Sequence, residues 1–148
     1  MKRFATVLLI SVAACHRGTA PTGSGTGAGS PEAAVNAFIA AAKAQDIQAM
    51  STVWGTARGP VRATMPRDEM DQRLIIMMQL MCQEDARVVG KSPAPEGKQF
   101  VRVELKRGAT AVQLNFTTVE GPSSRWYVFD FDNSRLQTFC RPSPSPTR

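Results

Sequence analysis

The chain has 148 residues, 43% of them hydrophobic, and its 18 Lys and Arg against 12 Asp and Glu give a formal net charge of +6. This length fits one small domain with its own hydrophobic core. The charge is modest and the basic residues do not line one helix face, so neither DNA nor RNA is an expected partner.

The first residues have the layout of a secretory signal. Lys2 and Arg3 supply a positive start, and residues 4–14 are apolar except for Thr6 and Ser11. A transmembrane helix needs about 20 apolar residues, so this stretch is too short to be a permanent span. We therefore expect residues 1–14 to be a signal peptide.

A cysteine follows the apolar stretch directly. The residues Val12-Ala13-Ala14-Cys15 resemble the lipobox of bacterial lipoproteins, in which the cysteine thiol receives a diacylglyceryl group and becomes the mature N-terminus. The resemblance implies lipidation of Cys15, a membrane lipid partner through the acyl anchor, and a location in the cell envelope. In this class His16, in place of an aspartate, favours the outer membrane, facing the periplasm or the exterior. An ordinary secretory signal that ends near Ala14 is the alternative.

Two segments have the composition of flexible chain. Residues 17–31 consist almost entirely of Gly, Ala, Ser, Thr and Pro, which bury too little apolar surface to offset the entropy of ordering. We expect 15–30 to be a lipidated N-terminus and flexible linker. The proline-rich residues 141–148 predict a disordered tail, and 31–140 the folded domain.

Three helices are predicted in the first half of the domain. Ser30 as cap, Pro31 in the first turn and Glu32 near the positive end of the dipole mark the first start. Val35, Phe38, Ile39 and Ala42 then recur at helical spacing. A second helix is expected to begin after Asp46 and to stop at Gly55, with a loop at 57–63.

The third helix is expected to open at Pro66 and to persist to about Cys82. Its predicted apolar face contains Met70, Leu74, Met77, Met78 and Met81. Methionine fills irregular gaps in cores, so this stripe is interpreted as packing. A copper site that uses Met78, Met81 and Cys82 is the weaker alternative. We expect no metal and no cofactor.

After residue 86 the hydrophobic period changes to two, which is typical of strands. Apolar and polar residues alternate over 101–106 and 112–117, around a tight turn at 107–109. A third strand is expected over 125–132, with shorter edge strands at 87–90 and 136–139. The predicted class is α+β, with N-terminal helices packed on an antiparallel sheet.

This order of elements and the phrase SPEAAVNAFIAAAKAQDIQAMSTVWG resemble the cone-shaped, cystatin-like domains of the superfamily of nuclear transport factor two, SnoaL-type cyclases and ketosteroid isomerase. The resemblance implies a curved sheet that wraps the first helix, with room for a pocket at the open end. Another α+β sandwich of helices on one sheet face is the alternative.

Cys82 and Cys140 are the only cysteines besides Cys15. An oxidising envelope compartment permits them to pair, so a structural disulfide is predicted. Two separate buried thiols are the alternative.

The domain contains no histidine, because His16 lies in the expected linker. Histidine-based acid-base catalysis is therefore excluded from it. Among enzymes of the similar fold, ketosteroid isomerase uses tyrosine and carboxylates. Strand alternation places Tyr127 on the face of Phe129 and Phe131. Asp130 and Asp132 then lie on the opposite face. We expect no catalytic residue.

Five residues are candidates for ligand binding. They are Trp54, Arg58, Arg62, Arg67 and Tyr127. The three arginines lie between the second and third helices, where they can bind an anion at the mouth of a cone. Trp54 is interpreted first as a packing residue.

The sequence predicts a membrane-anchored envelope lipoprotein whose domain is a non-catalytic binding or scaffold module with a small-molecule or protein partner. One alternative is a pocket enzyme acting on a small hydrophobic substrate, which fold analogy allows. Another is an accessory subunit that forms a homodimer through its sheet face.

Overall fold

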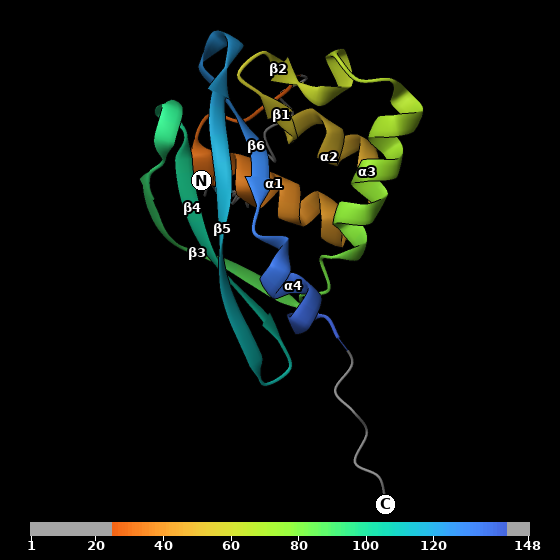
Figure 1. Cartoon of the computed structure of the whole chain (residues 1–148), viewed down its shortest axis with the longest axis vertical. Coiled ribbons are helices and arrows are strands. Elements are labelled where there is room, and N and C mark those ends of the chain that lie inside the picture. The colour runs from red at the N-terminus through yellow and green to blue at the C-terminus, as the bar shows by residue number, and fades with distance from the viewer. Residues whose placement is uncertain (1–24, 142–148) are drawn as a thin grey trace, which may run out of the picture.

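The computed structural model of the chain describes residues 25–141 and shows helices beside an antiparallel sheet (Figure 1). The helices are α1 (Pro31–Lys43), α2 (Ile47–Val53), α3 (Arg67–Gln79) and α4 (Asn133–Phe139). The main sheet has the order β3-β4-β5-β6, made of β3 (Asp85–Pro93), β4 (Gln99–Arg107), β5 (Thr110–Gly121) and β6 (Arg125–Phe131). Three helices are followed by an antiparallel meander, which confirms the predicted α+β class. The expected signal peptide, Cys15 and His16 lie outside the described residues.

Helix α1 begins as its sequence predicts. The Ser30 hydroxyl accepts a hydrogen bond from the Ala33 amide at 3.1 Å, and Pro31 occupies the first turn. All four apolar positions predicted for its stripe are buried: Val35, Phe38, Ile39 and Ala42. The helix contacts all four strands of the main sheet, so this stripe forms the centre of the core.

Aromatic side chains fill the space between α1 and the sheet. The ring centroids of Phe38 and Phe116 lie 6.4 Å apart, and those of Phe116 and Phe131 lie 5.3 Å apart. Phe38 and Phe116 have no exposed surface and Phe131 is 8% exposed. The centre of this layer is therefore packed core, as the hydrophobic pattern of α1 and the strands predicts.

Helix α3 ends at Gln79, earlier than the expected end near Cys82. The chain leaves the helix here because Cys82 forms a disulfide bond and the Glu84 amide donates to the Lys106 carbonyl at 2.9 Å, next to the first pairs of β3 and β4. The methionine face still contributes to the core through Met70, Leu74 and Met81, with Met77 and Met78 packed beside them.

The expected loop at 57–63 contains regular structure. A small hairpin joins β1 (Gly55–Thr56) to β2 (Gly59–Pro60), and a 3-10 turn follows at Val61–Ala63. Gly59 has a φ of 114°, which a residue with a side chain rarely adopts. The prediction of a loop is wrong here because strands this short carry no hydrophobic period.

The strand expected at 136–139 is wrong, since these residues belong to α4. The Asp132 side chain caps this helix by accepting a hydrogen bond from the Ser134 amide at 3.2 Å. Leu136 and Phe139 are both buried, and their spacing of three residues corresponds to one helical turn. The edge strand predicted at 87–90 is confirmed as part of β3.

Strand β6 is irregular, and this changes which side chains share a face. Its pairing with β5 shifts between Thr117 and Thr118, with Phe129 left opposite the shift. Val128 and Phe131 therefore both belong to the core. Tyr127, adjacent to Val128, then lies on the face away from the core, so the prediction that it shares the face of Phe131 is wrong.

Candidate functional site

Tyr127 is held at the edge of the sheet by three glycines. Its side chain is almost completely buried, with 2% exposure. A Cβ atom on any of these glycines would lie 2.7 to 2.8 Å from the tyrosine ring: Gly27, Gly55 and Gly121. The absence of side chains at these positions therefore makes room for the ring. Its hydroxyl lies 3.2 Å from Oγ1 of Thr26.

The segment just before α1 is attached to this tyrosine and to β6. Ala28 and Trp126 exchange backbone hydrogen bonds of 2.9 and 2.8 Å. Arg125 donates from Nη2 to the Gly27 carbonyl at 2.6 Å and from Nε to the Thr26 carbonyl at 3.2 Å. The last residues of the expected linker thus pack on the domain, although their composition is that of flexible chain.

A groove of about 560 Å³ opens beside Tyr127. Its lining includes Gly25 and Thr26 before α1, Arg58 and Pro60 from the hairpin, and Ser123 and Arg125 from the start of β6 and the turn before it. Arg58 is exposed, and within residues 25–141 neither Arg58 nor Arg125 forms an ion pair with a carboxylate. Two guanidinium groups and nearby hydroxyls are well suited to an anion such as phosphate or carboxylate.

The structure separates the three arginines that were predicted as one cluster. Arg58 lines the groove at Tyr127, whereas Arg62 and Arg67 line a smaller pocket of about 140 Å³ with Ser51. Arg67 also lies 3.7 Å from a carboxylate oxygen of Asp71. The second arginine of the groove is Arg125, which the sequence gives no reason to join with Arg58, because nothing local indicates that β6 lies beside the hairpin.

Both tryptophans pack against the core, as predicted for Trp54. Trp54 caps α2 and forms an isolated parallel bridge with Val128. Trp126 pairs with Ala28 on the other side of the same strand end. Both are partly buried against the hydrophobic core and lie outside the groove lining, so they are structural neighbours of the groove.

The predicted disulfide between Cys82 and Cys140 is confirmed. The Cα atoms lie 5.7 Å apart, and the bond closes a loop over a sequence separation of 58. It joins the segment between α3 and β3 to the end of α4. Arg107 adds a hydrogen bond from Nη1 to the Cys140 carbonyl at 3.1 Å. Because Cys82 is oxidised, its sulfur is not a thiolate ligand for the copper site considered above.

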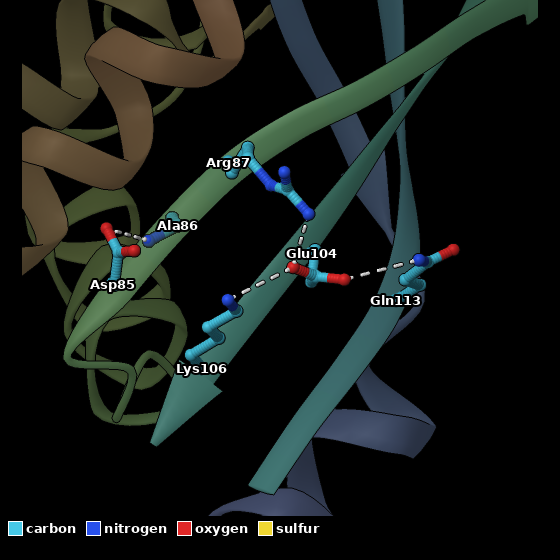
Figure 2. A network of polar contacts seen from close by, with 6 residues as sticks. All are labelled: Asp85, Ala86, Arg87, Glu104, Lys106 and Gln113. Carbon is cyan, nitrogen blue, oxygen red and sulfur yellow. Dashed lines mark hydrogen bonds and ion pairs between the residues drawn. The ribbon is translucent and has the colours of Figure 1, made fainter. Parts of the chain in front are cut away.

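The sheet face away from the helices carries a polar network centred on Glu104 (Figure 2). Arg87 of β3 donates to the Glu104 carboxylate at 2.9 Å, and Lys106 lies 3.6 Å away. Gln113 of β5 approaches the other oxygen at 3.5 Å. The hydrogen bond from Arg87 is the main cause that lowers the pKa of Glu104, so this carboxylate stays ionised and paired near neutral pH.

The polar groups that a tyrosine and carboxylate enzyme would need are engaged separately. The Tyr127 hydroxyl contacts Thr26, and Asp130 accepts a hydrogen bond from the Phe131 amide at 2.8 Å. Asp132 caps α4, and its hydrogen bond from Ser134 lowers the pKa of its carboxyl. The structure does not bring these three groups together.

No family model, no curated protein and no solved structure matches this chain. Within residues 25–141, no helix is long and apolar enough to cross a bilayer. No cluster of three or more His, Cys, Asp and Glu side chains suited to a metal ion occurs in the same range.

Proposed function

We propose that the chain is a lipid-anchored protein of the bacterial cell envelope, and that its domain is a non-catalytic binding module for an anionic ligand. The observation that carries the binding role is the groove beside Tyr127, where Arg58 and Arg125 have no carboxylate partner among the described residues. The observation that carries the anchoring is the sequence Val12-Ala13-Ala14-Cys15 after an apolar stretch.

The disulfide supports an exported location. Disulfides persist in secreted and periplasmic proteins and are rare where glutathione and thioredoxin keep thiols reduced. The bond between Cys82 and Cys140 links two half-buried residues that pack against the core, and it does not involve the expected anchor at Cys15.

The geometry favours binding over catalysis, because Tyr127, Asp130 and Asp132 are each engaged with a different neighbour. Four carboxyl groups in the described chain have shifted pKa values, and all four are lowered by hydrogen bonds or ion pairs: Glu32, Glu96, Glu104 and Asp132. A general acid that works near neutral pH needs the opposite shift, which an apolar pocket produces. The enzyme alternative therefore has no specific observation in its favour.

The polar sheet face likewise does not favour a homodimer through that surface. Its centre is the ion-pair network of Glu104, Arg87 and Lys106, whereas stable dimer interfaces have an apolar core.

The resemblance to cone-shaped domains remains part of the proposal, and the order of helices before an antiparallel meander supports it.

The anchoring is tested by fractionating bacteria that express the full chain. Wild type is expected in the membrane fraction and resistant to extraction with high salt, because two or three acyl chains give stable anchoring. The Cys15→Ser variant has no thiol to receive the acyl chains, so high salt without detergent is expected to extract it from the membrane. Wild type that is recovered in soluble cytosol contradicts the proposal.

The binding role is tested by titrating inorganic phosphate and small carboxylates into the full-length Cys15→Ser chain. Loss of any binding in Arg58→Gln, with binding retained in Arg102→Gln on the sheet face, supports the groove as the ligand site. Binding that depends on Arg102 and not on Arg58 contradicts this assignment.

A further inference from the structure

We propose that the groove beside Tyr127 is the surface with which the domain docks onto an anionic phospholipid membrane. This inference rests on the proposed lipid anchor and adds to it an orientation of the domain and a ligand class, the phosphate groups of lipid head groups. In this proposal the anion that the groove binds is a phosphate group of the membrane.

The covalent path between the anchor and the groove is short. Gly25 lines the groove, and 25 minus 15 gives ten residues from Cys15. A chain spans at most 3.3–3.6 Å per residue, so Gly25 lies no more than about 35 Å from the acylated residue. Thr26, Gly27 and Ala28 are fixed to β6, so this limit applies to the groove itself. The lipid anchor therefore keeps this end of the domain near the membrane surface.

The charge at this end complements an anionic surface. The lining contains Arg58 and Arg125 and no carboxylate. A groove beside α4 likewise contains Arg135 and Arg141 without a carboxylate, but it lies at the other end of β5, away from the segment that leads to Cys15. The Arg125 guanidinium is fixed by two carbonyl groups, so it loses little freedom when it binds a phosphate. Arg58 is exposed and free to reach a head group.

The two arginines alone bind a membrane weakly, but they can orient a domain that the lipid anchor already holds there. A basic residue near an anionic membrane contributes about a fivefold gain in membrane partition, and the gain is screened by salt. Two such residues do not hold a protein on a membrane alone. They select one orientation when the acyl chains supply the attachment, because the second contact is then intramolecular.

The test uses the lipidated full chain, with acylation confirmed by mass, in vesicles of phosphatidylcholine alone or with one quarter phosphatidylglycerol. Trp54 and Trp126 are the only tryptophans and both pack near the groove, so their quenching by head-group spin labels reports docking. We expect stronger quenching in the anionic vesicles, reduced by salt. Arg58→Glu is expected to lower the equilibrium constant for docking at least fivefold.

Arg102→Glu is the matched control, because it makes the same charge change at an exposed position on the sheet face. It is expected to behave as wild type. Thermal unfolding of both variants verifies that neither is unfolded. Quenching that is equal in neutral and anionic vesicles, or equal in wild type and Arg58→Glu, overturns the inference.

A second arm separates membrane phosphate from a soluble anion. Inorganic phosphate that binds the Cys15→Ser full chain through Arg58, together with no difference between the two vesicle types, assigns the groove to a soluble ligand and overturns membrane docking. An unmodified Cys15 in the purified wild type is instead a failure of the proposed anchoring, which the mass measurement identifies before vesicles are used.

Discussion

The two ends of strand β5 are closed in different ways. At its first residues, near Thr110, α4 packs against the strand and is joined by the Cys82–Cys140 disulfide to the segment before β3. At its last residues, near Gly121, the sheet is covered by Tyr127, the β1–β2 hairpin and residues 26–28, with no covalent link. The first closure combines packing of α4 with a covalent bond, whereas the second depends on the fit of the Tyr127 ring among glycines.

This difference has consequences for function. The disulfide restricts the unfolded chain, so it stabilises this end in addition to the packing of α4. The tyrosine end contains the groove and the entry of the chain into the domain. The groove proposed for binding thus lies at the end that small changes in packing or hydrogen bonding can alter.

The largest expected effect comes from removing the covalent closure. The Cys82→Ala and Cys140→Ala double variant is expected to lose about 4 kcal/mol of unfolding free energy, since a loop of 58 residues becomes free. Denaturant unfolding measures the loss, and reduction of wild type is expected to reproduce it. A loss below about 1 kcal/mol would show that packing of α4 alone closes this end.

The packed closure is tested by a single methyl group. Gly27→Ala places a Cβ 2.8 Å from the Tyr127 ring at a φ of 72°, so a cost of about 1–3 kcal/mol is expected. Gly29→Ala is the matched control, because nothing lies within 4 Å of its Cβ, and its effect is expected within about 0.5 kcal/mol. Equal effects of the two changes would contradict the account of the glycine fit.

A smaller effect is expected from the tyrosine hydroxyl. Tyr127→Phe removes its contact with Thr26 and is expected to cost about 1 kcal/mol, with faster hydrogen exchange at the Ala28 amide. Combining it with Thr26→Val gives a double-mutant cycle. Strictly additive costs would show that the two hydroxyls do not interact.

The smallest effect expected is the dependence of stability on pH that comes from Glu104. Ion pairing lowers the pKa of Glu104, so its contribution to stability is complete above the ordinary carboxyl pKa and is lost as the pH falls through its value in the folded protein. Glu104→Gln is expected to be less stable than wild type near neutral pH, with a difference that shrinks below pH 4, a limit taken as about the reference carboxyl value. Denaturant midpoints at several pH values measure this. A difference that grows on acidification contradicts the assigned pairing.

The sequence predicts the end of the sheet that the disulfide closes. Two cysteines in a chain that is expected to be exported are enough to predict a bond. The helical stripe of α1 and the alternation in β4 and β5 are strong periodic signals. The α+β class and most elements follow from these signals. The strand expected at 136–139 was wrong because four residues do not distinguish a short helix from a strand.

The tyrosine end was less predictable because its determinants are not local. Gly27 lies in a segment with the composition of a linker. Only the folded chain shows that it packs against Tyr127, one hundred residues away. The shift in pairing at Thr117 and Thr118 moved Tyr127 to the other face of the sheet, which alternation alone does not predict. The pairing of Arg125 with Arg58 in one groove was also unpredictable, because no local residue pattern indicates that β6 lies beside the hairpin.

Intact mass spectrometry of the protein extracted from bacterial membranes tests the central claim most directly. The account predicts a chain that begins at Cys15 and carries the mass of a diacylglyceryl group, with or without a further acyl chain, and one disulfide. A chain that retains residues 1–14, or one with an unmodified Cys15 sulfur, would contradict it.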